Sequence, residues 1–244
     1  MDPEARVGIY YSPCDDDPLF AAGAAWLGRN PARGDRIAQP NIPGIDEVTA
    51  EARGYGFHAT LKPPMRLAQG RCWDELLTAT RELATRIAPF ALPSLAVTDL
   101  HGFLDLCETR FCPPLQALAD ACVERLDSFR APPSETELAR RRRAQLTEAQ
   151  QAMLLRFGYP YVLDTWFFHM TLTRRLSTTE HATWRPEVER YFEAAVATQR
   201  MVTDICLFTQ PGPGEPFVIG ERIALAGQGS RAFRCDPGVS TSSR

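Results

Sequence analysis

Two of the four histidines in this chain of 244 residues stand in the same short pattern. His58 lies in GYGFHATLKPP and His169 in DTWFFHMTLTRRL, and each is followed two residues later by Thr and three residues later by Leu. An imidazole takes up or releases a proton near neutral pH, so two of them can act as general base and general acid. His58, Thr60, His169 and Thr171 are therefore the candidate catalytic residues.

If each motif is a β-strand, its side chains alternate between two faces. The His and Thr of each copy then share one face, and the apolar residues anchor the other face in the core. A single copy would be more typical of a half-buried structural histidine, whereas two copies in matching contexts favour chemistry. The apolar residues in question are Phe57, Ala59 and Leu61 in the first copy and Phe168, Met170 and Leu172 in the second.

Two such polar faces opposite one another suit a tetrahedral phosphate. One neutral imidazole can take a proton from water or a hydroxyl, while the other, protonated, gives one to the leaving oxygen. The two Thr hydroxyls can donate hydrogen bonds to the non-bridging oxygens, where negative charge accumulates. This set of groups requires no metal ion and no cofactor. A metal-dependent phosphatase, the alternative, would need a cluster of His, Asp and Glu that the sequence does not show.

Five further residues are candidates for binding the substrate. A lysine two positions after the first Thr and an arginine after the second motif could neutralise phosphate charge, although solvated surface positions fit them equally well. A phenylalanine on the face of the second histidine could stack on a base or sugar, with core packing as the alternative. Two tyrosines could line the pocket. These residues are Lys62, Arg174 (or its neighbour Arg175), Phe167, Tyr11 and Tyr161.

The most basic run of the chain is Arg140–Arg143, in a segment with helical character. Four consecutive residues point all around a helix axis, so these arginines cannot form one patch together. We interpret the run as a solvated helix face. A role in gripping an anionic substrate is the alternative.

Strand and helix patterns alternate along the chain in an order that indicates an α+β fold with two lobes. The turn residues Pro63-Pro64 are expected to end the first motif strand. The strand patterns are Arg6–Tyr11, Phe57–Pro63, one or two within Phe90–Cys107, a β-rich segment Tyr161–Thr173, Met201–Thr209 and Phe217–Ala226. The helix patterns are Pro18–Leu27, Trp73–Ala88, most of Leu115–Gly158 and about Thr178–Ala197, with a loop at Asn30–Asp46.

The net charge of −3 at pH 7 gives no support for a broad nucleic-acid surface or a polybasic membrane patch. The seven cysteines form no CxxC pair, the N-terminal segment is too polar for a signal peptide, and no apolar run reaches transmembrane length. We therefore expect a cytoplasmic protein with free thiols and no membrane partner.

The two copies resemble the paired H-x-[ST]-hydrophobic signatures of the two-histidine (2H) phosphoesterase superfamily, which includes the bacterial 2′-5′ RNA ligase-like proteins and cyclic nucleotide phosphodiesterases. The flanks narrow the resemblance. GYGFHATLKPPMRLA and YPYVLDTWFFHMTLTRRL, with VGIYYSP near the start, are similar to a branch of phosphonate metabolism proteins whose genes accompany carbon–phosphorus lyase genes. The similarity spans Val7 to about Ala226.

The resemblance implies a bilobal 2H phosphoesterase (RNA ligase-like) fold of the α+β class. Two pseudo-twofold-related lobes would carry antiparallel sheets flanked by helices and enclose a central cleft. We expect one domain over residues 1–228, with the first motif in a lobe at about 6–110 and the second in a lobe at about 111–228. A flexible tail is expected at residues 229–244.

The resemblance also implies metal-independent phosphodiester chemistry on a small phosphorylated substrate. The expected reaction opens a cyclic phosphodiester, on a small phosphorylated ribose cyclic phosphate formed during phosphonate breakdown. Nucleoside 2′,3′-cyclic phosphates or RNA ends fit the motifs as well, although the net acidic composition disfavours RNA. A non-catalytic protein that holds a phosphorylated ligand for a phosphonate-degrading assembly is a further alternative. The sequence leaves open which histidine is the acid and what the oligomeric state is.

Overall fold

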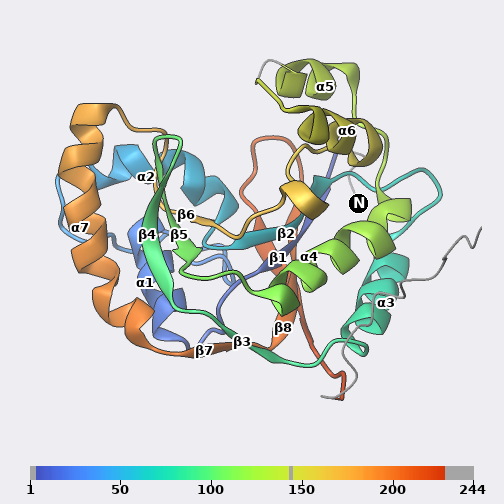
Figure 1. Cartoon of the computed structure of the whole chain (residues 1–244), viewed down its shortest axis with the longest axis horizontal. Helices are drawn as coiled ribbons and strands as arrows, with labels where there is room; N and C mark the ends of the chain where they lie inside the picture. Colours follow the sequence, from blue (N-terminus) through green and yellow to red (C-terminus); the bar gives the residue numbers. More distant parts are fainter. Residues whose placement is uncertain (1–3, 143–144, 229–244) are drawn as a thin grey trace, which may run out of the picture.

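The computed structural model describes residues 4–142 and 145–228, and the expected tail at 229–244 lies outside them. Its architecture is α+β, with antiparallel sheets and helices packed on them, as the sequence pattern predicts (Figure 1). The first motif belongs to a four-stranded sheet in the order β2-β1-β8-β9. These strands are β1 (Arg6–Tyr11), β2 (Ala59–Met65), β8 (Asp204–Gln210) and β9 (Val218–Ala224).

The second motif belongs to a three-stranded sheet in the order β4-β5-β6. A separate two-stranded sheet is formed by β3 and β7. In Figure 1 the two motif strands, β2 and β6, lie at the facing edges of the four-stranded and the three-stranded sheet. The strands of the smaller sheets are β3 (Phe90–Leu92), β4 (Leu95–Leu100), β5 (Phe103–Glu108), β6 (Met170–Thr171) and β7 (Arg200–Val202).

Each sheet combines strands from both ends of the chain, so the expected division into lobes near residue 110 is wrong. The strands β8 and β9 come from the C-terminal part but pair with β1, while β4 and β5 come from the N-terminal part but pair with β6. Local patterns of hydrophobicity reveal that a segment is a strand. They do not reveal which distant strand supplies its hydrogen-bond partners.

The first motif strand runs through the two prolines that were expected to stop it. β2 extends to Met65, past Pro63 and Pro64. It is an edge strand, with β1 as its single neighbour in the sheet order. An edge strand has one side without ladder partners, and there the missing proline N–H costs nothing.

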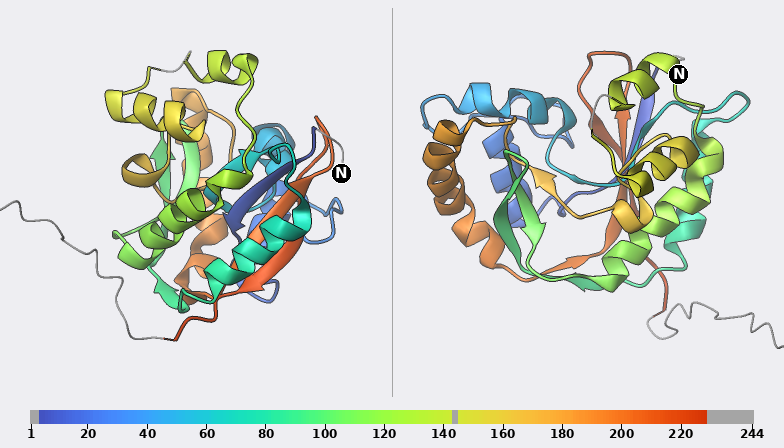
Figure 2. Two further views of the ribbon diagram at one scale, coloured as in Figure 1. Left: turned by 90° about the vertical axis from the view of Figure 1, so that its right-hand side faces the viewer. Right: turned by 45° about the horizontal axis from the view of Figure 1, so that its top comes forward.

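Helices cover the outer sides of these sheets (Figures 1 and 2). α1 packs against α2 and α7, and α7 also contacts β4. α3 contacts α4 and β9, while α4 lies against β2. The pair α5 and α6 stands apart from them at the top of Figure 1. The helices are α1 (Pro18–Leu27), α2 (Ile45–Tyr55), α3 (Trp73–Ala84), α4 (Pro113–Leu126), α5 (Glu135–Arg142), α6 (Glu148–Phe157) and α7 (Thr178–Ala197), with short 3₁₀ turns η1 (Asp127–Phe129) and η2 (Leu163–Thr165).

Two segments differ from the sequence-based expectation. Tyr161–Thr173 was expected to be β-rich but contains only η2 and the two-residue strand β6. The helix α2 was not predicted, although Ile45, Val48 and Ala52 are buried at helical spacing. Glycines stand at both ends of α2, and glycine is typical of loops. The short helical pattern between them was therefore not recognised. None of the helices in the described part of the chain is long and apolar enough to cross a membrane.

Candidate active site

The alternation of faces predicted for the first motif is present. Phe57, Ala59 and Leu61 are fully buried, whereas His58 and Thr60 are only half-buried. In the second motif, the residues Phe168, Met170 and Leu172 are likewise buried, and His169 and Thr171 remain partly exposed. The apolar residues therefore anchor each motif in the core and leave its imidazole and hydroxyl accessible.

The two motif strands contact each other across the boundary between the sheets. β2 and β6 are both edge strands, and they lie against one another. The indole Nε1 of Trp166, three residues before His169, donates a hydrogen bond of 2.8 Å to the carbonyl oxygen of Thr60. This bond ties the segment that carries the second motif to the backbone of the first.

The imidazole of His58 is fixed on several sides. Its Nδ1 lies 2.8 Å from the carbonyl oxygen of Gly56, which can only accept, so Nδ1 carries the proton in the neutral ring. Its Nε2 lies 3.4 Å from the hydroxyl of Thr60. The ring stacks on Tyr10, with centroids 3.8 Å apart and an interplanar angle of 20°. This arrangement leaves Nε2 as the basic nitrogen, on the side of Thr60.

Burial, together with the charges of His169 and Arg29, lowers the pKa of His58 to about 4. Arg29 is itself buried and donates hydrogen bonds to the carbonyl oxygens of Arg53, Gly54 and Phe217, which hold the turn before His58. At neutral pH the imidazole of His58 is therefore uncharged. An uncharged imidazole with an unprotonated Nε2 is able to accept a proton.

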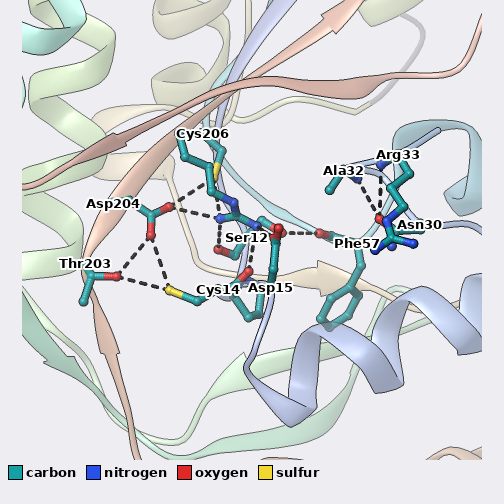
Figure 3. Close-up of polar contacts among 12 residues, drawn as sticks. Ser12, Cys14, Asp15, Asn30, Ala32, Arg33, Phe57, Thr203, Asp204 and Cys206 are labelled. Atoms are coloured by element: carbon teal, nitrogen blue, oxygen red, sulfur yellow. Dashed lines mark hydrogen bonds and ion pairs between the residues drawn. The ribbon is translucent and has the colours of Figure 1, made fainter.

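Ser12 holds the entry to the first motif strand from the other side (Figure 3). Its hydroxyl donates to the carbonyl oxygen of Phe57, the residue before His58, at 3.1 Å. The carbonyl oxygen of Ser12 in turn accepts from Arg222, which also binds Asp204 and Asp15. These bonds fix the backbone just after β1 beside the residues that precede β2.

His169 has a similar backbone contact, since its Nδ1 lies 3.1 Å from the carbonyl oxygen of Phe167. The ring of Phe167 lies close by, at a centroid distance of 4.8 Å, and 38% of Phe167 is exposed. Two more rings continue this row toward the first motif: Tyr161 packs edge-on against Phe167, and Tyr159 against Tyr161. Phe167 thus lies next to His169, and Tyr161 lies one ring further from it.

Thr171 makes a contact that the sequence did not indicate. Its hydroxyl donates to Oδ1 of Asp105 at 2.7 Å, and the two residues are paired in register between β5 and β6. Asp105 is 1% exposed, and burial raises the pKa of its carboxyl group. Asp105 therefore positions the Thr171 side chain. The signal in the sequence that could have indicated Asp105 was a single carboxylate between two leucines in the segment FLDLCE.

A cavity of about 240 Å³ adjoins the first motif. It is bordered by His58 and Thr60, three tyrosines, two arginines and two prolines, and neither His169 nor Thr171 is among its lining residues. The other lining residues are Tyr10, Tyr55, Tyr159, Arg6, Arg141, Pro63 and Pro64. Tyr159 connects this cavity with the row of rings that ends at His169.

Lys62 does not share the face of Thr60, contrary to expectation. Tyr10 pairs with Thr60 and Ile9 with Lys62, so β2 carries one extra residue at this point. Such a bulge breaks the alternation of faces. Lys62 is 1% exposed and its Nζ lies 2.9 Å from Oδ1 of Asp127. Burial lowers the pKa of Lys62, and the ion pair opposes that shift.

Replacing Lys62 with Met should therefore affect stability and leave activity nearly unchanged. Met keeps most of the volume, and Asp127 keeps its two hydrogen bonds to Arg130. We expect the free energy of unfolding to fall by about 1–3 kcal/mol, the value of a hydrogen bond to a charged group. Denaturant unfolding and steady-state kinetics measure the two effects. A large loss of kcat/KM at unchanged stability would restore the phosphate-binding role of Lys62.

Two other candidates lie away from the cavity. Tyr11 is 3% exposed and packs against Phe168, so its expected place in the pocket is wrong. Arg174 is bound by two carboxylates, those of Glu47 at 2.6 Å and Glu180 at 2.8 Å. These hydrogen bonds raise the pKa of Arg174 and fix the loop after the second motif.

The residues that the sequence reasoning missed are the lining residues Tyr10, Tyr55, Tyr159 and Arg6. Tyr10 shares a face with Thr60 because the two are paired in register, while its neighbour Tyr11 points into the core. Of the run Arg140–Arg143, Arg141 lines the cavity, and Arg143 lies outside the described residues. Arg141 thus lies where the alternative interpretation of this run, a role in binding an anionic substrate, would require a cation.

Within residues 4–142 and 145–228, no group of three or more His, Cys, Asp or Glu side chains is placed to hold a metal ion. The six cysteines in these ranges are free thiols.

The chain belongs to the family described as "Protein of unknown function (DUF1045)", whose profile matches residues 60–218. Two curated relatives carry the name "Ribose 1,5-bisphosphate phosphokinase PhnN". The relative from Janthinobacterium sp. (strain Marseille) is 42% identical over 236 residues, covering 93% of this chain and 52% of the relative. The relative from Laribacter hongkongensis (strain HLHK9) is 32% identical over 237 residues, covering 96% of this chain and 55% of the relative. The chain thus spans about half the length of these relatives.

Among solved structures, the chain is similar to one described as "Crystal structure of phosphoesterase", with a TM-score of 0.43 and 14% identity over 91% of this chain and 98% of that one. It is also similar to LigT of E. coli, solved as a complex with NADP+, with a TM-score of 0.41 and 15% identity over 92% of this chain and 99% of that one. Similarity at this level does not assign a function.

Proposed function

We propose that the protein is a phosphoesterase of the two-histidine type, which opens a cyclic phosphodiester by acid–base catalysis without a metal ion. The observation that supports this most directly is the hydrogen bond from Trp166 to the Thr60 carbonyl, because it joins the two motif segments at their adjacent edge strands. In each motif, Nδ1 of the histidine lies at hydrogen-bond distance from a backbone carbonyl oxygen, and Nε2 points away from that oxygen. The two imidazoles are thus held alike.

In this mechanism His58 is the base. Its Nε2 takes a proton from a water molecule whose oxygen attacks the phosphorus atom. The bond between phosphorus and one ring oxygen breaks, and protonated His169 gives its proton to that oxygen. The product is a phosphate monoester with a free hydroxyl. The Thr60 hydroxyl would donate to a non-bridging oxygen. The single hydroxyl proton of Thr171 is donated to Asp105, so Thr171 supplies no donor to the phosphate while that bond is present.

The pH dependence of the rate should show an unusual acid limb. The base must be uncharged, so activity is lost as the pH falls through the pKa of His58. Because burial lowers this pKa to about 4, we expect kcat/KM to persist down to that pH. An ordinary imidazole would lose activity near pH 6.5. Kinetics from about pH 3.5 to 9, with the fold checked by circular dichroism, measure this limb; a limb near 6.5 would remove His58 from the base role.

The proposed substrate is a small phosphorylated ribose cyclic phosphate, in phosphonate catabolism. The relatives named for ribose 1,5-bisphosphate support a ribose phosphate, although this chain spans only about half of them. The lining residues of the cavity include two arginines and none that is acidic, which supports a substrate of high negative charge.

Hydrolysis should survive excess EDTA, since the imidazoles and hydroxyls complete the reaction by themselves. The test is to incubate the purified protein with a panel of cyclic phosphates, with and without the chelator, and to follow the monoester by phosphorus NMR. The panel should contain ribose cyclic phosphates, nucleoside 2′,3′-cyclic phosphates and short RNAs with cyclic ends. Activity that EDTA abolishes and a divalent cation restores would replace this proposal with metal-dependent hydrolysis.

A further inference from the structure

We propose that the cavity beside His58 is the binding site for a second phosphate group, a monoester on the same sugar as the cyclic phosphate. This inference rests on the proposed function and locates the part of the substrate that does not react. The two charged groups that carry it are the guanidinium groups of Arg6 and Arg141, on opposite elements, β1 and α5.

Arg6 is held with its binding atoms available. Its Nε donates to Oε1 of Gln210 at 2.7 Å, and its guanidinium lies over the ring of Phe217 at 5.3 Å. Gln210 is itself buried and anchored to the carbonyl oxygen of Glu215. The other four N–H groups of Arg6 belong to its two terminal nitrogens. That fork matches two oxygens of a phosphate.

Arg141 comes to the cavity from α5 and lies over the ring of Tyr159, 4.6 Å from its centroid. The lining residues of the cavity thus include two guanidinium groups and no carboxylate.

The tyrosines favour a phosphate group over a nucleobase. One face of each ring is already covered: that of Tyr10 by His58, that of Tyr55 by Phe217 and that of Tyr159 by Arg141. Burial raises the pKa of both Tyr10 and Tyr159, so their hydroxyls stay protonated and can donate. Hydroxyl and guanidinium donors together suit an oxyanion.

The size and position of the cavity fit a compact molecule. A volume of about 240 Å³ lies below the roughly 300–1,000 Å³ of pockets for drug-sized ligands. His58 and Thr60 form one wall of the same cavity. A cyclic phosphate at His58 and a monoester at the two arginines would therefore be joined by a single sugar, and the second phosphate would align the first for attack.

The test compares methyl riboside 2,3-cyclic phosphate with the same compound carrying a 5-phosphate. We expect the wild type to prefer the phosphorylated compound in kcat/KM by roughly 10- to 100-fold, as charged hydrogen bonds allow. Arg6→Gln and Arg141→Gln should each remove most of that preference. Arg185→Gln is the matched control, because Arg185 pairs only with Glu189 on the exposed side of α7 and should keep the preference.

Each outcome decides a separate point. Equal kcat/KM of the wild type for both compounds overturns the phosphate site and leaves the proposed function standing. If the wild type hydrolyses neither compound, the proposed function fails, and calorimetry with ribose 5-phosphate tests the site alone. Binding by the wild type and the Arg185 variant, with weaker binding by the two cavity variants, supports the site. No binding by the wild type overturns it, and thermal unfolding checks that every variant is folded.

Discussion

Replacement of His58 or His169 with Ala should lower kcat by about 10²–10⁴-fold, the usual value of a general acid or base. The fold should be unaffected, because both imidazoles are partly exposed while the apolar residues of each motif stay in the core. Loss of His58 removes the base, and loss of His169 removes the proton donor for the leaving oxygen. Steady-state kinetics on the cyclic phosphate that the panel identifies measure both losses.

The double variant tests whether the two histidines work together. Catalytic groups that act on one proton-transfer sequence are non-additive, so the double variant should lose less than the product of the single losses. His181→Ala provides the control histidine, since His181 lies on α7 and pairs with Asp99. Near-normal turnover by a folded His58→Ala or His169→Ala variant would refute the acid–base pair.

Gly8→Ala should lower kcat/KM by about 10²-fold, the cost of misplacing a catalytic group by roughly 1 Å. A Cβ at Gly8 would lie 2.5 Å from Cζ of Tyr10, so the tyrosine ring would have to move. That ring is stacked on the imidazole of His58. The displacement would therefore reach the base directly, although Gly8 itself contacts no substrate.

A matched control separates this effect from a general intolerance of alanine. Gly54 has no atom within 4 Å of an added Cβ and lies in the last turn of α2, so Gly54→Ala should leave kcat/KM and stability nearly unchanged. The combination of Gly8→Ala with Tyr10→Leu removes the ring that clashes. If Gly8→Ala alone is fully active, the packing of Tyr10 does not position His58.

Local patterns were sufficient to predict several elements of the fold. The helices Pro18–Leu27 and Thr178–Ala197 and the strand Arg6–Tyr11 occur with the predicted bounds. The alternation of faces around His58 and His169 also follows from strand geometry alone. The alternation of faces fails at Lys62, because a β-bulge depends on how two strands pair. It cannot be recognised from the sequence of one strand.

The remainder of the site depends on contacts between distant segments. Arg6 and Arg141 meet at one cavity only because β1 and α5 are brought together in three dimensions. Asp105 reaches Thr171 through a strand pairing across 66 positions of the chain. No pattern within a single segment contains this information, so the sequence indicated the catalytic groups but missed the groups that position them and line the cavity.

The strand order β2-β1-β8-β9 also has a consequence for synthesis on the ribosome. Arg6 pairs with Gln210, so one neighbour of β1 does not exist until the roughly 200 residues that separate the two strands have been translated. At about 5–20 residues per second, these roughly 200 residues take on the order of 10–40 s. During that interval the exposed edge of β1 is open to wrong partners. An unpaired edge of this kind is the type of surface that chaperones cover during synthesis, here until β8 is available.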